Sequence, residues 1–140
     1  MNVGAISMPK IIAIDPGKHT GIARWPKCRT ETYEAEDISV MTDLVHWHNL
    51  SSYDLVIVED YKDYTQFNNK HSEIPMSIVH ILKGQAEIGN INLEVQSPLV
   101  KRMAKGQSKL INKFEPMATQ HEKDAAYHII AYLLTKGYSR

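Results

Sequence analysis

The sequence predicts an α/β fold, a mixed five-stranded sheet with its first three strands antiparallel, flanked by helices. Two observations predict it. Five short segments have the continuous apolar or alternating pattern of strands, and the segments between the later ones space apolar residues as a helix does. The chain has 140 residues, 43% of them apolar. This fits one compact domain over residues 1–140, with residues 1–9 as a candidate disordered segment.

The first three predicted strands form an antiparallel meander. Residues 10–14 read as a buried strand that ends at Asp15, and after a Pro-Gly turn residues 20–25 form a second strand. Residues 30–35 (TETYEA) alternate polar and apolar side chains, with threonine and tyrosine prominent. This composition favours a third strand.

The later strands are predicted to alternate with helices. Residues 55–58 (LVIV) are a short apolar run typical of a central strand, and residues 92–95 predict a fifth strand. The remaining elements are a helix over 39–50 with Ser39 as its N-cap, a loop over 61–73, a helix over 75–88 that opens on a proline, and a helix after Ser97-Pro98.

The last helix has the clearest boundaries. Thr119 and Glu122 stand in the T-x-x-E relation of a capping box, and Gly137 marks the end. His128 within it is more simply explained as a satisfied polar neighbour than as a ligand. The helix carries an apolar stripe of Ala126, Ile129, Ile130, Leu133 and Leu134.

Acidic residues follow two of the predicted buried strands. Asp15 comes after IIAI and Glu59 after LVIV, and a carboxylate there is costly unless it is paired or bound to a cation. If the first and fourth strands are neighbours, the two carboxylates meet at one sheet edge, where Asp124 completes a cluster. Each acid alone is more often a helix cap or a surface salt bridge, so the joint pattern carries the prediction. Clustered carboxylates bind hard cations, which predicts two Mg²⁺ ions, with Mn²⁺ as a substitute, for phosphodiester hydrolysis.

Two choices at this cluster stay open from the residues alone. His121 precedes Asp124 by three residues on the same helix face. It is a candidate to ligate metal, to orient water or to protonate a leaving group. Strand alternation points only one of Glu59 and Asp60 inward, and periodicity does not decide which.

Formal net charge is zero, which argues mildly against a nucleic-acid-binding domain, but the charges are unevenly distributed. Acids outnumber bases in residues 1–60, whereas residues 99–113 carry five bases and no acid. This basic segment is either a solvated face or a phosphate-binding surface. Its bases are Lys101, Arg102, Lys105, Lys109 and Lys113.

The sequence shows no membrane-spanning run and no secretory leader, so we expect a soluble cytoplasmic protein, in a bacterial cell or a phage-infected host. The single cysteine, Cys28, excludes an internal disulfide and a Cys-rich zinc site.

Five segments resemble, in order, those of the RuvC-type Holliday junction resolvases, and the resemblance spans nearly the whole chain. It implies an RNase H-like fold and a Mg²⁺-dependent homodimer that nicks two strands of a four-way DNA junction. The compact form is more similar to phage-encoded members than to cellular ones. The segments are IIAIDPGKHTGIA around Asp15, VIVED around Glu59, LKGQAEI around Gly84, SPLVKRMAKG around Lys101 and HEKDAA around Asp124.

The resemblance also implies roles for individual residues. Asp15, Glu59, His121 and Asp124 would be the catalytic and metal-binding set, which favours Glu59 over Asp60. Lys101, and less directly Lys109, would hold or neutralise the scissile phosphate. Together with Arg102 and Lys105 they are the candidate basic contacts to DNA.

Three aromatic residues in the predicted loop after Glu59 are candidates to contact DNA. Tyr61, Tyr64 or Phe67 would stack on a base opened at a junction, or else pack on the domain. They are displaced from the usual position of the family's stacking phenylalanine, which leaves the choice of substrate open.

Other functions fit the sequence less well. The turn DPGKHTG resembles the phosphate loop of actin-like ATPases, but those enzymes need two such domains, and a P-loop needs a glycine ahead of the GK. A nuclease acting on RNA or on flaps shares the same acids and stays an alternative. A junction-binding protein that does not cleave also stays an alternative, but its acid cluster would repel DNA unless metal is bound.

The helix over 75–88 is the candidate dimer contact. A four-way junction is nearly two-fold symmetric, and a two-fold dimer supplies the paired cuts. Ile78, Ile81, Leu82 and Ile88 offer more apolar surface than one face needs for packing on the sheet. The alternative is that all of it is core.

Overall fold

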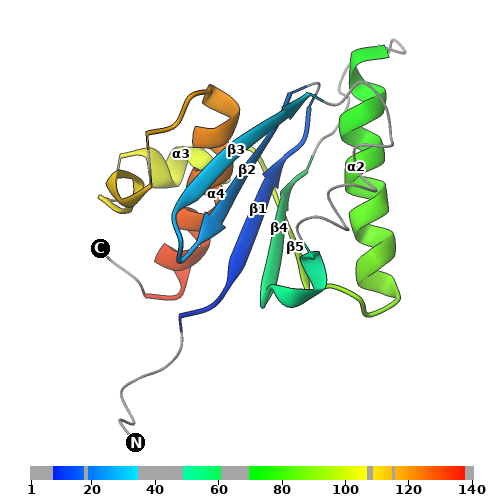
Figure 1. Cartoon of the computed structure of the whole chain (residues 1–140), viewed down its shortest axis with the longest axis horizontal. Helices are drawn as coiled ribbons and strands as arrows, with labels where there is room; N and C mark the ends of the chain where they lie inside the picture. Colours follow the sequence, from blue (N-terminus) through cyan, green and yellow to red (C-terminus); the bar gives the residue numbers. More distant parts are fainter. Residues whose placement is uncertain are drawn as a thin grey trace, which may run out of the picture.

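The computed structural model describes residues 8–17, 19–34, 49–60, 70–106, 109–114 and 116–137. Five strands form one sheet in the order β3-β2-β1-β4-β5 (Figure 1). Each predicted strand is confirmed to within one residue at both ends. The strands are β1 (Ile11–Asp15), β2 (His19–Trp25), β3 (Arg29–Glu34), β4 (Leu55–Glu59) and β5 (Leu93–Gln96).

The sheet is mixed, as predicted. β1 pairs antiparallel with β2, and β2 pairs antiparallel with β3. On its other side β1 pairs in parallel with β4, and β4 with β5. The first and fourth strands are therefore neighbours, which brings their carboxyl ends to the same edge of the sheet.

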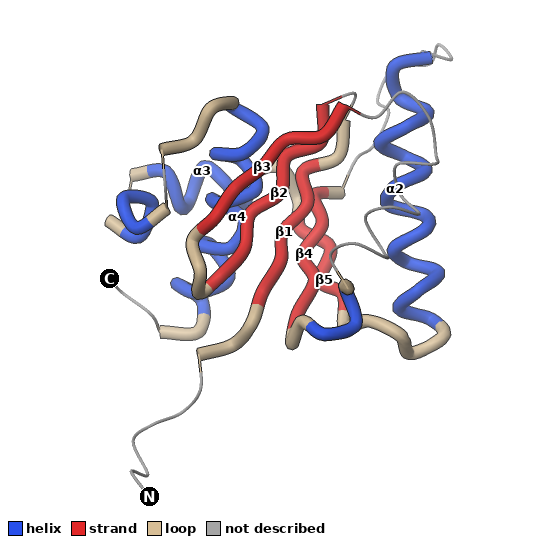
Figure 2. The backbone as a smooth tube through the Cα atoms, in the orientation of Figure 1, coloured by secondary structure: helices blue, strands red, loops and turns tan. Residues whose placement is uncertain are grey.

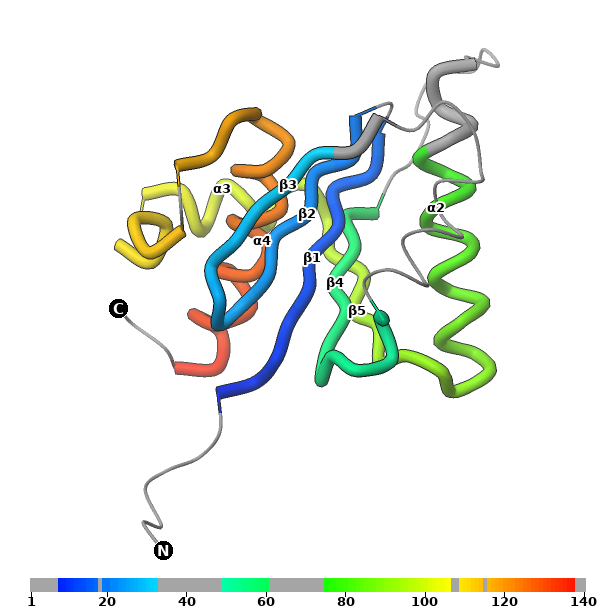
Figure 3. Tube along the Cα trace, in the orientation of Figure 1, coloured from blue at the N-terminus to red at the C-terminus, as the bar shows by residue number. Residues whose placement is uncertain are grey.

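Helices cover both faces of the sheet, so the fold has three layers (Figure 2). α2 (Lys70–Glu87) lies on one face, and α3 (Val100–Lys105) and α4 (Gln120–Thr135) lie on the other. Two short 3₁₀ segments complete the described elements, η1 (Leu50–Ser52) and η2 (Leu110–Lys113). Figure 3 shows the chain passing from α3 through η2 into α4 on one side of the sheet.

Strand alternation divides the core between the two faces. Ile12 and Ile14 of β1, with Val56 and Val58 of β4, pack in the cluster that includes Leu82 of α2. The other residues of these strands face the α4 side, where the apolar stripe of α4 covers them; they include Ile11, Ala13, Leu55 and Ile57. Asp15 lies two residues after Ala13, and Glu59 two residues after Ile57. Both therefore point to the α4 side.

α4 matches its prediction closely. The Thr119 side chain accepts a hydrogen bond from the Glu122 backbone N–H at 3.1 Å, which caps the helix. The helix ends at Thr135. Gly137 follows with a φ of 90°, a left-handed conformation that glycine adopts without strain.

α2 differs from its prediction in two ways. It begins at Lys70, so Pro75 lies inside the helix rather than at its first position. Ile78 and Leu82 are fully buried against the sheet and Ile81 packs on the same cluster, while Ile88 follows the helix and is 75% exposed. Most of the predicted spare apolar surface therefore belongs to the core, because a sheet buried on both faces uses it there, and only Ile88 is left exposed. The helix as a dimer contact stays a prediction.

Several predictions concern residues outside the described ranges. They are the helix over residues 39–50 up to residue 48, the disordered segment up to residue 7, and the aromatic residues Tyr61, Tyr64 and Phe67. None of the described helices is both long and apolar enough to cross a membrane.

Candidate active site

Asp15 and Glu59 meet at the carboxyl ends of β1 and β4. The register pairs Ile14 with Val58, so the next residue of each strand faces the other. Both side chains are buried. Burial raises the pKa of Asp15, and the hydrogen bond and negative charge of Glu59 raise it further. Two adjacent carboxylates repel each other in such a place, and a nearby cation relieves this repulsion.

Glu59 is the ionised member of this pair. Burial by itself would raise the pKa of Glu59, but hydrogen bonds with His128, Asp15 and Lys101 outweigh burial and hold that pKa below its usual range. The structure thus places Glu59 beside Asp15 on the α4 side, whereas Asp60 follows the end of the strand.

α4 brings two further predicted residues to the same edge. His121 lies with its Nδ1 3.6 Å from Asp15 Oδ2, and its side chain is 43% exposed. Asp124, one turn further, has its side chain 16% exposed. His121 therefore stands at the open side of the carboxylates, while Asp124 stands deeper.

Gly21 sets how closely α4 approaches the sheet. It pairs with Asp15 across β1 and β2. A Cβ built on Gly21 would lie only 2.1 Å from the carbonyl oxygen of His121 and 2.8 Å from the Glu122 backbone nitrogen. Only glycine permits this contact, because the neighbouring atoms are backbone and cannot move aside without moving the helix. Sequence reasoning missed this residue, although a glycine inside a strand is the signal for such a close approach.

Glu122 anchors the same end of α4. Its carboxylate accepts hydrogen bonds from Thr30 at 2.7 Å, Thr32 at 2.7 Å and Thr119 at 3.0 Å. Burial would raise the pKa of Glu122, but these hydrogen bonds outweigh burial and lower it. The predicted capping role is confirmed at Thr119, and the contacts to β3 add a tie between helix and sheet.

Lys101 of α3 places a positive charge among the carboxylates. Its Nζ lies 2.7 Å from Glu59 Oε1 and 3.4 Å from Asp124 Oδ2, and its side chain is 16% exposed. Burial would lower the pKa of Lys101, but the hydrogen bond to Glu59 and the charges of the three acids outweigh burial and raise it. Lys101 therefore stays an ammonium cation that bridges two of the acids.

His128 contacts Glu59 from the core side. The ring is fully buried, with Nε2 2.9 Å from Glu59 Oε1 and Nδ1 2.7 Å from Gln96 Oε1. Its interpretation as a satisfied polar neighbour is confirmed, but its partner is a member of the cluster. Gln96 ends β5 and was missed, because a single glutamine at a strand end carries no sequence signal.

The other predicted bases lie outside this cluster. Arg102, Lys109 and Lys113 are exposed, and Lys105 Nζ lies 5.7 Å from the centre of the Tyr127 ring. The structure thus brings Asp15, Glu59, His121, Asp124 and Lys101 together and leaves the remaining bases on the surface.

The chemistry of the donors fits a divalent cation, but the arrangement as it stands is not a preformed metal site. Within the described part of the chain, no three His, Cys, Asp or Glu side chains are placed to hold a metal ion together. The Lys101 ammonium lies where two of the carboxylates would share a cation. This contact shows a cluster that attracts positive charge.

Comparisons with solved structures identify the fold. No family model and no curated protein sequence matches the chain. RuvC of T. thermophilus in complex with a Holliday junction substrate matches with a TM-score of 0.62 and 13% identity, covering 93% of this chain and 97% of that one. The Thermus thermophilus RuvC structure matches with a TM-score of 0.58 and 15% identity, covering 94% and 98%. The chain has the RNase H-like fold of RuvC.

The similarity to RuvC extends over nearly the whole of both chains, so the sheet and the helices on its two faces are shared. The fold expected from the resemblance is confirmed. At 13 to 15% identity, the RuvC comparison establishes the architecture, and the chemistry has to be argued from the side chains at the sheet edge.

Proposed function

We propose that this chain is a metal-dependent endonuclease that hydrolyses phosphodiester bonds in branched DNA, with four-way junctions as its substrate. The observation that carries the proposal is the charged cluster at one sheet edge: three carboxylates, a buried ammonium and a half-open imidazole within contact distance. The RuvC fold supports the choice of substrate, because a RuvC of this fold has been solved with a Holliday junction.

The residues that would hold the metal are Asp15, Glu59 and Asp124, with His121 as a further ligand. Their oxygen donors suit Mg²⁺ or Mn²⁺, two ions per site. When bound, divalent ions supply positive charge that activates water and stabilises the phosphate oxygens during displacement. The Lys101 ammonium lies in the same cluster without metal, so Glu59 and Asp124 already have a positive partner there.

The chain's own residues have separate roles in this proposal. Lys101 carries an ammonium at the cluster, placed to neutralise a phosphate oxygen near Glu59 and Asp124. His121 is the more exposed member, so it can orient water or give a proton to the leaving oxygen. His128 and Gln96 hold Glu59 in place from the core. Arg102, Lys105 and Lys109 are exposed on the same side and would contact the DNA backbone.

We also propose that the active form is a homodimer of one-domain subunits, because paired cuts at a nearly two-fold junction need two sites at fixed separation. Sedimentation with and without junction DNA tests this part. A monomer in both conditions that nicks strands independently would exclude the dimer.

A cleavage assay tests the proposed function. The purified chain is incubated with four-way, flap and linear DNA and with an RNA–DNA hybrid, in Mg²⁺, in Mn²⁺ and in EDTA. We expect cleavage of the four-way junction in either metal and none in EDTA. Preferential cleavage of the hybrid or the flap would instead identify the other nuclease activities that these acids support. Junction binding without cleavage in either metal would identify a binding protein.

A further inference from the structure

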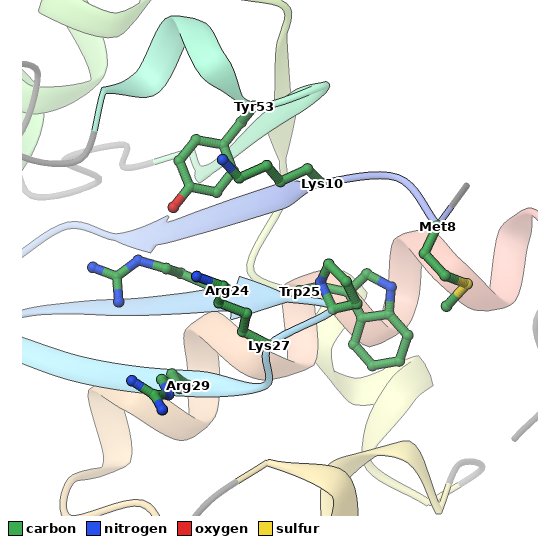
Figure 4. Close-up of a pocket in the computed structure, with 8 residues that line it drawn as sticks. Met8, Lys10, Arg24, Trp25, Lys27, Arg29 and Tyr53 are labelled. Carbon is green, nitrogen blue, oxygen red and sulfur yellow. The ribbon is translucent and has the colours of Figure 1, made fainter.

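A basic cavity lies at the end of the sheet opposite the carboxylates. It has a volume of about 500 Å³, and four of its lining residues are positively charged: Lys10, Arg24, Lys27 and Arg29 (Figure 4). They come from the start of β1, the end of β2, the β2–β3 turn and the start of β3. None of the residues that line the cavity is acidic.

Two neighbouring acids contact the residues of the cavity and offset part of its charge. Arg24 forms an ion pair with Glu31. Asp54 accepts a hydrogen bond from the Lys10 backbone N–H at 2.7 Å, while the Lys10 ammonium lies 4.8 Å from the centre of the Tyr53 ring. Both acids lie outside the cavity lining. The cavity therefore presents more positive than negative side chains.

Two of the cations face each other across neighbouring strands. Arg24 and Arg29 are direct partners in the β2–β3 register, so their side chains leave the same face of the sheet a few ångströms apart. Like charges directly opposite each other destabilise a strand pair. Glu31 offsets part of this cost through its ion pair with Arg24. The planar guanidinium fork of each arginine also matches the geometry of phosphate oxygens.

We propose that this cavity binds the phosphate backbone of DNA, and that it holds an arm of the substrate away from the cleavage site. The choice of DNA rests on the proposed function. Four cations from several chain segments suit a run of phosphates better than one small anion. The five residue-to-residue steps from Lys10 to Asp15 along β1 separate the cavity from the acids by roughly 17 Å at about 3.3 Å per residue. This distance is equivalent to about five base-pair steps of a duplex.

This arrangement explains how a chain with no net charge can bind DNA. The carboxylate end of the sheet repels phosphates unless cations are bound there, whereas the opposite end attracts them whatever the state of the cluster. The cavity thus gives the chain a metal-independent DNA contact, and it orients the molecule on its substrate.

The first test is direct observation of the cavity by NMR. A short unbranched duplex is added to the ¹⁵N-labelled chain without divalent metal. The backbone amides of Trp25, Lys27, Cys28 and Arg29 and the Trp25 indole N–H should shift. The Trp25 indole is a useful reporter because its Nε1 is buried with no hydrogen-bond partner among the described residues. Shifts confined to residues around Lys101 would overturn the proposal.

The second test compares two variants of equal charge. The double variant Lys27→Gln, Arg29→Gln removes two exposed cations of the cavity, and Lys83→Gln, Lys136→Gln removes two exposed cations elsewhere. Binding of a four-way junction is measured in Ca²⁺ across a salt series. The slope of log K against log salt is negative, and its magnitude should decrease by about 1.8 for the cavity variant, at about 0.9 per phosphate contact. For the control, the slope should stay near the wild-type value. Equal slopes in all three proteins would overturn the proposal.

The outcomes separate this proposal from the proposed function. Shifts at the cavity on adding duplex, in a chain that cleaves no branched DNA, would support DNA binding at the cavity and contradict the proposed nuclease function. Junction cleavage with an unaffected cavity would do the reverse. Shifts on adding a polyglutamate peptide but not on adding DNA would overturn the assignment to nucleic acid and indicate an acidic protein partner.

Discussion

Charged side chains are arranged differently at the two ends of the sheet. At the carboxyl ends of β1 and β4 the charges are buried and paired with one another, as in the contacts of Glu59 with Lys101 and His128. At the opposite end the cations line an open cavity without an acid among them. Buried charges need partners to be tolerated, whereas cations at a solvent-accessible cavity keep part of their hydration and can still contact a ligand. This difference underlies the two proposals, cleavage at the first end and phosphate binding at the second.

The carboxyl ends of β1 and β4, where the charges are paired, are called the paired end below. The largest expected effect comes from removing one acid there. Asp15→Asn should slow junction cleavage by more than about 10³-fold, because an amide cannot supply the negative charge that a cation site needs. Binding of the junction in Mg²⁺ should stay intact or tighten, since repulsion of phosphates falls. Single-turnover cleavage and fluorescence anisotropy measure the two effects. Cleavage near the wild-type rate would contradict the assignment of Asp15.

The sequence allowed much of the paired end to be predicted. Asp15 and Glu59 follow apolar runs that can only be buried strands, and Asp124 follows a clear helix cap, so local patterns located all three. The partner of His128 was not predictable, because Glu59 lies 69 residues away in the sequence. The basic cavity was missed for the same reason, since its cations are close only after the sheet forms, while the basic run at 99–113 is local.

The next effect concerns the contact that positions α4 at the paired end. Gly21→Ala should lower the free energy of unfolding by about 3 kcal/mol or more, because the added Cβ would meet the His121 carbonyl at 2.1 Å. Gly84→Ala in α2 is the matched control. Nothing lies within 4 Å of a Cβ there, so it should be neutral or stabilising by about 0.5 to 1 kcal/mol. Urea unfolding of both variants measures this difference, and equal stability would show that α4 is not held at this distance.

A smaller effect is expected at His128, which holds Glu59 without reaching the open side of the cluster. His128→Ala should slow cleavage by about 10- to 100-fold at saturating Mg²⁺, as loss of a supporting hydrogen bond does. It should also lower the apparent affinity for Mg²⁺. His128→Gln keeps a donor in the ring's place and should recover part of the rate. Metal titrations of single-turnover cleavage test this. If both variants lose stability but keep the wild-type metal dependence, His128 has a packing role only.

The smallest effect tests whether Lys101 takes the place of a cation at the paired end. Its ammonium contacts Glu59 at 2.7 Å and Asp124 at 3.4 Å, and Met has a similar length without the charge. Without metal, Lys101→Met should lower the free energy of unfolding by about 1 to 2 kcal/mol, since the carboxylates lose their partner. Thermal unfolding should show a fall of several degrees.

Magnesium decides between this explanation and simple loss of packing. An ion that binds only the folded chain stabilises it by mass action, and in Lys101→Met it no longer competes with an ammonium for Glu59 and Asp124. The rise in melting temperature with Mg²⁺ should therefore be larger in the variant than in the wild type. Lys83→Met, at an exposed position on α2, should respond as the wild type does. A variant that Mg²⁺ stabilises no more than the wild type would show that Lys101 and the metal do not share a position, and that the carboxylates bind their cation elsewhere.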